Sequence, residues 1–155
     1  MRAIIILRRC RAAQDDIRSL DQRIERWRDV LTSIGTLQAD PNGGSRGSGD
    51  RDRYGRIMAD MDLLEREKSR REEAWEAEKV SCCALLDMVP DLESDILHAY
   101  YVNAMDTGAI ARAKHMTPGY IRKTKRNAEQ LLDMVDAGRV AGTLPAWYLR
   151  EYPEE

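Results

Sequence analysis

The chain has 155 residues, of which 34% are charged and none is Phe, and its formal net charge at pH 7 is −2. Many charged residues with few aromatics favour long, solvated helices over one compact core, because a helix needs only a stripe of apolar residues to pack against a partner. The small net charge excludes a generally basic protein, so any basic surface has to be local.

The residue types that support catalysis or metal binding do not occur in suitable patterns. The cysteines, Cys10, Cys82 and Cys83, are odd in number, and their spacing fits no metal site. We find no nucleophile–base pairing and no phosphate-binding loop. No stretch approaches membrane-spanning length, and the apolar run at residues 4–7 is too short for a signal peptide. The sequence predicts a cytoplasmic protein that is not an enzyme and has no cofactor, metal or membrane partner.

The first predicted element is a long helix over residues 3–37. Its apolar residues recur at alternating steps of four and three, which is the spacing of a coiled-coil seam. The seam consists of Ile6, Cys10, Ala13, Ile17, Leu20, Ile24, Trp27, Leu31 and Ile34. Residues 39–53 then combine Pro41 with several glycines, serines and aspartates, so we expect a flexible loop there.

A second long helix is predicted over residues 54–89, ended by Pro90. Its seam keeps the same spacing but is polar in the middle, at Lys68, Arg71 and Glu78. Two such helices predict an antiparallel coiled-coil hairpin about 50 Å long. Pairing of one or both helices with another copy, which gives a homodimer through the coiled coil, is an alternative that the seam leaves open.

Short helices with a tight turn follow the second long helix. We expect helices over residues 91–101 and 107–113, a turn at 114–116, and a last helix over 118–135. Thr117 is a good N-cap, and Pro118 suits the first helical position, where its missing N–H costs nothing. A short helix, a tight turn and a capped longer helix are typical of a helix-turn-helix unit.

The charge of this segment differs from that of the rest of the chain. Residues 107–128 contain six Lys or Arg and no Asp or Glu, while the remaining residues hold 19 basic and 27 acidic side chains, a net charge of −8. On the last helix, Ile121, Thr124, Ala128, Leu131 or Leu132, and Val135 share one face. Gly119, Lys123, Arg126 and Gln130 lie opposite, with Arg122 and Asn127 on the flanks. This pattern predicts a basic face that can enter the major groove of double-stranded DNA.

The candidate DNA-binding residues receive separate roles. Tyr120, Arg122 and Lys123, near the helix start, are candidates for base contacts, and Gly119 permits a close backbone approach. Asn127 can pair with adenine. Contacts to phosphate, which position the protein without reading sequence, are expected from Arg112, Lys114, Lys125 and Arg126, with Thr117 capping the helix. The alternative is a solvated basic helix in an ordinary bundle.

The segment from Leu92 to Leu132 resembles region 4 of bacterial sigma factors. In particular it resembles the sigma-region-4-like phage regulators related to the RinA and ArpU late-gene activators. The resemblance rests on the junction Val89-Pro90-Asp91-Leu92, the segment Ile96-Leu97-His98-Ala99-Tyr100-Tyr101-Val102, and the pair Gly108-Ala109-Ile110-Ala111 and Thr117-Pro118-Gly119-Tyr120-Ile121. The chain departs from the family pattern at residues 106–109, where an aromatic-acidic segment is usual, and at Thr124, where Leu is common. The family implies control of phage or prophage transcription, and RNA polymerase as a partner.

Together these features predict an all-α protein with a coiled-coil hairpin at residues 1–89, a helix-turn-helix domain at 90–136 and a tail at 137–155. The aromatic tail around Trp147 and Tyr148 is expected to fold back onto the hairpin. The leading hypothesis is a sequence-specific transcription regulator. Two alternatives stay open, a small-terminase-like packaging oligomer and a coiled-coil protein that binds RNA polymerase.

Overall fold

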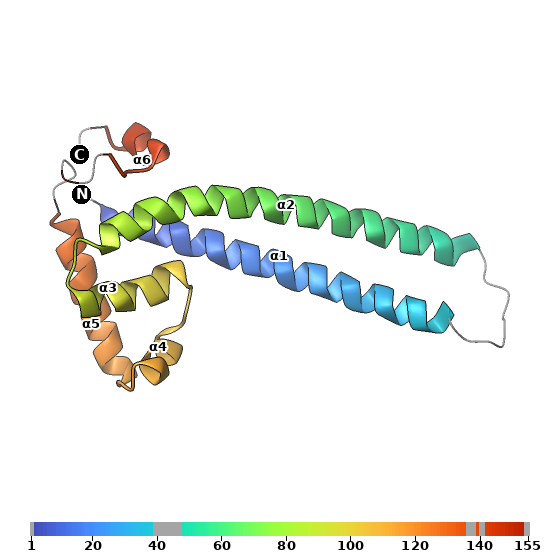
Figure 1. Ribbon diagram of the computed structural model, residues 1–155, viewed down its shortest axis with the longest axis horizontal. Helices are drawn as coiled ribbons and strands as arrows, with labels where there is room; N and C mark the ends of the chain where they lie inside the picture. Colours follow the sequence, from blue (N-terminus) through green and yellow to red (C-terminus); the bar gives the residue numbers. More distant parts are fainter. Residues whose placement is uncertain (1, 39–47, 136–138, 140–141, 154–155) are drawn as a thin grey trace. The chain divides into compact units, whose positions relative to one another are not determined.

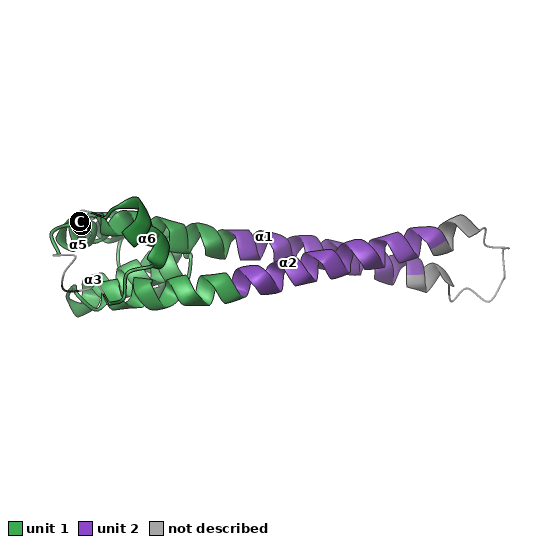
Figure 2. Ribbon diagram, turned by 90° about the horizontal axis from the view of Figure 1, so that it is seen from above, with its two compact units in different colours: residues 1–15, 73–155 green, residues 16–72 purple. Residues whose placement is uncertain are grey.

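The computed structural model describes residues 2–38, 48–135, 139 and 142–153 (Figure 1). All regular structure in these ranges is helical, which confirms the predicted all-α class. None of the helices in the described ranges combines the length and apolar character needed to cross a membrane. Contacts divide the chain into two compact units, residues 1–15 with 73–155, and residues 16–72 (Figure 2). The expected domain boundary between residues 89 and 90 stays a prediction.

The two long helices are α1 (Ala3–Gln38) and α2 (Ser48–Leu86). The bounds of α1 agree closely with the prediction, whereas α2 begins before residue 54. The expectation of a loop is therefore wrong for residues 48–53, and the rest of that loop lies outside the described residues. Once a helix is nucleated, each added residue gains a hydrogen bond, and this offsets the penalty of about 1 kcal/mol for a glycine. At its other end α2 stops at Leu86, three residues before the predicted end, and residues 87–89 form a turn that leads to Pro90.

In the unit of residues 16–72, α1 and α2 pack against each other through a narrow apolar seam. Ile17, Leu20 and Ile24 of α1 and Ile57 of α2 are buried. Asp16 pairs with Arg71, Asp21 with Lys68, and Arg28 with Glu65. Because the partner's number falls as the α1 number rises, the two helices are antiparallel.

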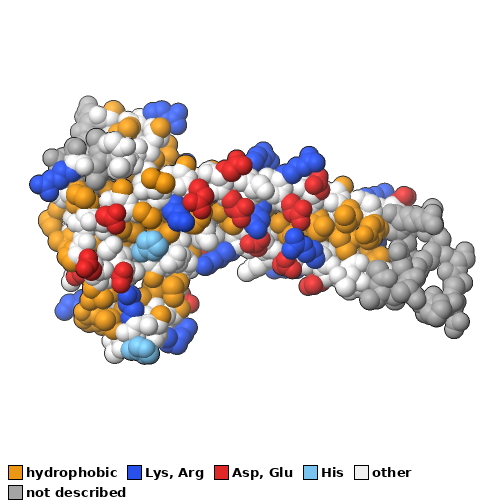
Figure 3. Space-filling view, in the orientation of Figure 1, with side chains coloured by type: hydrophobic (Ala, Val, Ile, Leu, Met, Phe, Trp, Pro, Cys, Tyr) orange, Lys and Arg blue, Asp and Glu red, His pale blue; other side chains and the backbone are white. Residues whose placement is uncertain are grey.

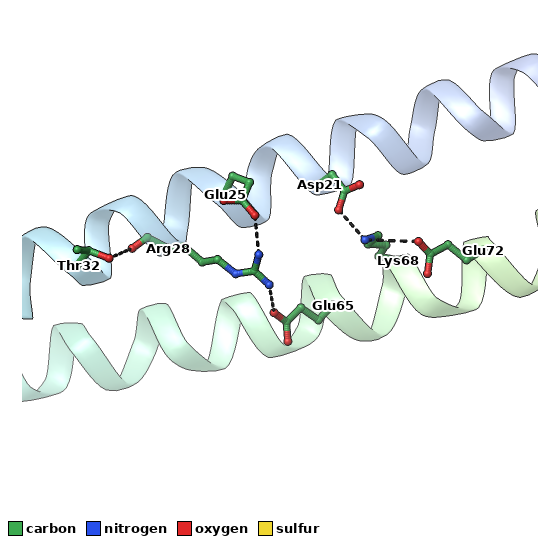
Figure 4. A network of polar contacts seen from close by, with 7 residues as sticks. All are labelled: Asp21, Glu25, Arg28, Thr32, Glu65, Lys68 and Glu72. Atoms are coloured by element: carbon green, nitrogen blue, oxygen red, sulfur yellow. Dashed lines mark hydrogen bonds and ion pairs between the residues drawn. The ribbon is translucent and has the colours of Figure 1, made fainter. Parts of the chain in front are cut away.

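In the polar middle of the seam, charged side chains form ion pairs between the two helices (Figure 4). Lys68 Nζ lies 2.6 Å from Asp21 and 3.4 Å from Glu72, and the hydrogen bond to Asp21 raises the pKa of Lys68. The Lys68 stem is half-buried while its ammonium reaches the carboxylates, as expected when long side chains cover apolar surface. Acidic and basic side chains are interspersed along the face of the long helices seen in Figure 3.

The other unit contains the larger core. It combines the start of α1, the end of α2 and the C-terminal helices, and its fully buried side chains include Ile6, Leu7, Leu85, Leu97, Leu132 and Tyr148. Helix α6 (Ala146–Glu151) brings Tyr148 into this core, where its hydroxyl accepts a 2.9 Å hydrogen bond from the Arg2 backbone. The Arg9 guanidinium lies 4.2 Å from the centre of the Trp147 ring. These contacts confirm that the aromatic tail folds back onto the start of α1.

Three short helices and a π-helical turn complete this unit. They are α3 (Asp91–Leu97), the turn η1 (His98–Val102), α4 (Thr107–Ala113) and α5 (Pro118–Asp133). The helix predicted over residues 91–101 is present, but its last part widens into the π form, with the Asn103 N–H donating to the carbonyl of His98. A small second core of Ile96, Ile110, Ala111 and Ile121 joins α3, α4 and α5.

Candidate nucleic-acid interface

Both short helices at the basic segment begin with a side-chain cap. Thr117 Oγ1 accepts a 3.2 Å hydrogen bond from the Tyr120 N–H, and Pro118 occupies the first turn, as predicted. Asp106 caps α4 in the same way, accepting a 2.7 Å bond from the Ala109 N–H. This second cap was missed, although an aspartate just before a helix is its usual sequence signal. The caps define where each helix starts, and so the direction in which α5 leaves the turn.

The turn between α4 and α5 is a closed helix C-terminus of the Schellman type. The His115 N–H donates to the Arg112 carbonyl at 3.3 Å, and the Met116 N–H donates to the Ala111 carbonyl at 2.9 Å. His115 adopts φ 54°, in the left-handed region where glycine is usual. Met116 packs beside Ala111 in the small core, which is the apolar contact that accompanies this motif. The turn therefore sets the angle between α4 and α5 through backbone bonds.

Helix α5 has the orientation that its apolar spacing predicts. Ile121, Thr124, Ala128 and Leu132 are buried, whereas Leu131 is 40% exposed, so Leu132 supplies the inward leucine. The opposite face is exposed, with Gly119, Lys123, Arg126 and Gln130 in its centre and Arg122 and Asn127 on its flanks. The buried and polar faces of the helix are thus separated as the sequence indicates.

Four basic side chains of this segment point into solvent without a carboxylate partner. Arg112, Arg122, Lys123 and Arg126 are exposed, and none makes an ion pair within the part of the chain that the structure describes. Tyr120, also in the first turn of α5, is 47% exposed. Positive charge that no internal carboxylate neutralises is available to an anionic partner.

Gly119 lies in open space on this face. A Cβ added there would meet nothing within 4 Å, and no left-handed φ is present. The fold itself therefore does not require glycine at this position. The expected role, close approach of the backbone to a partner, is compatible with this geometry.

Two of the basic residues that we expect to contact phosphate pair with carboxylates of the chain instead. Lys114 Nζ is 2.9 Å from Asp95 and its side chain is 26% exposed. Lys125 pairs with Glu129, and its Nζ lies 4.4 Å from the centre of the Tyr100 ring. Lys125 follows Ile121 by four residues, so it stands at the edge of the buried face, where Glu129 is within reach. We therefore remove Lys114 and Lys125 from the candidate interface.

A group of polar contacts behind α5 was not anticipated. Arg11 Nη1 donates to the carbonyls of Tyr100 and Met105, at 2.6 and 3.0 Å, and its guanidinium lies 3.9 Å from the centre of the Tyr100 ring. The buried Tyr101 hydroxyl donates a 2.6 Å hydrogen bond to Glu129. Burial, together with this bond, raises the pKa of Tyr101. No sequence motif indicates these contacts, because they join residues far apart in the chain.

A shallow hollow of ≈ 250 Å³ lies beside this group, lined by Arg8, Arg11, Ala12, Asp15, Tyr100, Tyr101, Lys125 and Glu129. Its charges are largely matched internally, by Arg11 with Asp15 and by Lys125 with Glu129. Nor do the described residues hold any cluster of His, Cys, Asp or Glu arranged to bind a metal ion. The exposed face of α5 is therefore the best candidate for a functional site.

No family model matches the chain, and comparisons with curated proteins and with solved structures find no match.

Proposed function

We propose that the chain is a sequence-specific DNA-binding transcription regulator of phage or prophage genes. In this proposal α4 and α5 form a helix-turn-helix unit, α5 enters the major groove, and the long helices α1 and α2 form a coiled-coil hairpin that carries it. The observation that carries the proposal is the exposed row of Arg122, Lys123 and Arg126 on a capped helix, without carboxylate partners among the described residues.

The geometry of α5 suits base recognition near its start. The major groove of B-DNA admits one α-helix, and a recognition helix contacts base edges with its N-terminal residues. Arg122 and Lys123 can donate to the O6 and N7 atoms of guanine, and Tyr120 can contact bases or the backbone. The positive end of the helix dipole favours nearby phosphates. The side chains in the first part of α5 are therefore the ones that we propose to contact bases.

Phosphate contacts are assigned to the two remaining exposed cations. Arg112, at the end of α4, and Arg126, in the middle of α5, flank the proposed base-reading residues. Such contacts supply affinity and orientation but no sequence information. Asn127, exposed beside Arg126, can pair with adenine if α5 lies deep in the groove.

The first experiment is selection of bound fragments from DNA of the protein's own source replicon, at moderate salt. Enrichment of one short motif upstream of a transcription unit supports the proposal. Salt-sensitive binding without a motif contradicts sequence-specific regulation and favours a packaging role. Absence of binding contradicts a DNA-binding function and leaves the long helices as the part that binds a partner, such as RNA polymerase.

A matched pair of variants tests the assignment to α5. Arg122→Ala with Lys123→Ala should weaken binding to the selected motif by about 100-fold, since each good base contact contributes about 1–3 kcal/mol. The control is Arg23→Ala with Arg26→Ala, which removes the same two charges from the exposed face of α1. Circular dichroism should show equal helicity in both. If the α5 variant binds the motif as tightly as the control, the assignment of the recognition helix is wrong.

A further inference from the structure

Two of the three cysteines belong to the larger core, within the unit of residues 1–15 and 73–155. Cys10, in α1, and Cys82, in α2, are both 0% exposed. Cys82 Sγ donates a 3.8 Å hydrogen bond to the Ile6 carbonyl, which in an α-helix also accepts from the N–H four residues on, that of Cys10. Side chains of a helix lean toward its N-terminus, so the Cys10 sulfur lies over the same turn. The two sulfurs therefore meet between the start of α1 and the end of α2.

A hydrogen bond joins the two thiols and makes them chemically unequal. It lowers the pKa of Cys10 and raises the pKa of Cys82, so Cys82 is the S–H donor and Cys10 the acceptor. The Trp75 indole N–H also lowers the pKa of Cys10, and this buried N–H has no other hydrogen-bond partner within the described ranges. Two donors thus favour the thiolate of Cys10, which is the nucleophilic form of a cysteine.

The third cysteine is directed elsewhere. Cys83 follows Cys82 in α2, and successive side chains of a helix point about 100° apart. Cys83 Sγ lies 3.9 Å from His98 Nε2, and burial raises the pKa of its thiol. Because Cys83 is only partly buried and contacts neither sulfur of the pair by a described hydrogen bond, it serves as an internal control.

We propose that Cys10 and Cys82 form a reversible disulfide on exposure to hydrogen peroxide, and that this bond fastens the start of α1 to the end of α2. In the first step the Cys10 thiolate attacks one peroxide oxygen. The O–O bond breaks, Cys10 becomes a sulfenic acid, and hydroxide leaves and takes up the proton that Cys10 has lost. In the second step the Cys82 sulfur attacks the Cys10 sulfur, the S–O bond breaks, and the oxygen leaves with the Cys82 proton as water. The two thiols lose two electrons in total, and the peroxide is reduced to two water molecules.

The surroundings of the pair determine when it reacts. Neither thiol contacts solvent, so peroxide reaches Cys10 when the start of α1 opens locally. This end of α1 is closed by the hydrogen bond from the Arg2 N–H to the Tyr148 hydroxyl. It is also covered where the Arg9 guanidinium lies over the Trp147 ring. Disulfides that form in a reducing compartment are usually transient and redox-sensing, which is the behaviour proposed. The inference does not rest on the proposed DNA-binding function.

Peptide mapping of the full chain tests the pairing. The reduced protein is treated with hydrogen peroxide, its free thiols are alkylated, and its peptides are analysed by mass spectrometry. The wild type should lose two hydrogens and give one intrachain link between Cys10 and Cys82, with Cys83 alkylated. Cys83→Ser should give the same link, and a dithiol reductant should return every cysteine to the alkylated form. A link that includes Cys83, or free thiols at Cys10 and Cys82 under conditions that oxidise free cysteine in the same solution, would overturn the proposal.

Two further measurements test the roles of the two sulfurs and the effect of the bond. Dimedone, which reacts with sulfenic acids, should label Cys10 in Cys82→Ser, whereas Cys10→Ser should leave Cys82 unlabelled; circular dichroism checks that both variants keep their helicity. The oxidised wild type should melt about 5–10 °C above the reduced protein, because the bond closes a long loop of the unfolded chain, and Cys83→Ser should show the same rise. Labelling of Cys82 in Cys10→Ser, or an oxidised chain that melts no higher than the reduced one, contradicts the proposal.

Discussion

Arg11 forms a hydrogen bond with the backbone carbonyl of Tyr100 and lies over the ring of the same residue. Its Nη1 donates a 2.6 Å hydrogen bond to the Tyr100 carbonyl, while the guanidinium lies 3.9 Å from the centre of the same residue's ring. The same nitrogen also donates to the Met105 carbonyl. One side chain of α1 thus fastens both the π-helical turn and the segment that leads into α4. This contact therefore links the segment that leads into α4 to α1.

Replacing Arg11 by alanine should lower the free energy of unfolding by about 2–3 kcal/mol, because two carbonyls lose a charged donor. Arg11→Lys should recover only part of this loss, since an ammonium cannot bond both carbonyls and also lie flat on the ring. Urea denaturation measures both values. Arg8→Ala, a neighbouring exposed residue, is the control and should change stability by less than about 0.5 kcal/mol. Equal effects of Arg8→Ala and Arg11→Ala would contradict the role given to Arg11.

Removing the hydroxyl of Tyr101 should cost about 1 kcal/mol at neutral pH, because Glu129 then keeps only Lys125 as a partner. Tyr101→Phe is the variant, and thermal unfolding followed by circular dichroism gives the difference. Tyr100→Phe serves as the control, because no hydrogen bond of its hydroxyl is described. If Tyr101→Phe is as stable as the wild type, the hydrogen bond to Glu129 contributes nothing.

The same residue predicts a dependence on alkaline pH. Burial and the bond to Glu129 raise the pKa of Tyr101, whereas an unfolded tyrosine ionises near about pH 10. The contribution to stability is therefore fully present below about pH 10 and is lost as the pH rises further. The stability difference between the wild type and Tyr101→Phe should shrink above that pH, as measured by urea unfolding at several alkaline pH values. A constant difference would contradict the raised pKa.

The effect of replacing His115 on stability should depend on how easily the new residue adopts the left-handed backbone conformation. His115→Gly should retain or slightly raise stability, because glycine adopts φ 54° without strain. His115→Val should lower it by about 1–2 kcal/mol, because a β-branched residue is disfavoured there. Since His115 is exposed, lost packing adds little in either variant. Thermal unfolding of the two variants compares them directly, and a valine variant as stable as the glycine variant would show that the strain is absent.

The salt dependence of DNA binding should separate Arg126 from its neighbour Lys125. Arg126→Ala should reduce the slope of log K against log salt by about 0.9, the value for one lost phosphate contact. Lys125→Ala should leave the slope nearly unchanged, because Lys125 already pairs with Glu129. Binding titrations at several salt concentrations give both slopes. An equal reduction for the two variants would return Lys125 to the interface.

The sequence by itself determined that the chain is helical, that Thr117 caps α5 with Pro118 in its first turn, and which faces of α5 are buried and exposed. These features are local, because helical periodicity places residues three and four apart on one face whatever the helix packs against. For the same reason the exposure of Arg122, Lys123 and Arg126 could be predicted, as could the inward positions of Ile121, Thr124 and Ala128.

Only the tertiary structure decided which basic residues remain available and what holds the basic segment in place. Lys114 is paired with Asp95, and Arg11 reaches Tyr100, at separations along the chain that periodicity cannot link. Nor does any sequence pattern indicate the π-helical turn or the left-handed conformation of His115, where no glycine marks the position. A contact between distant residues is selected by the balance of burial and desolvation in the folded chain, and that balance exists only once the helices have come together.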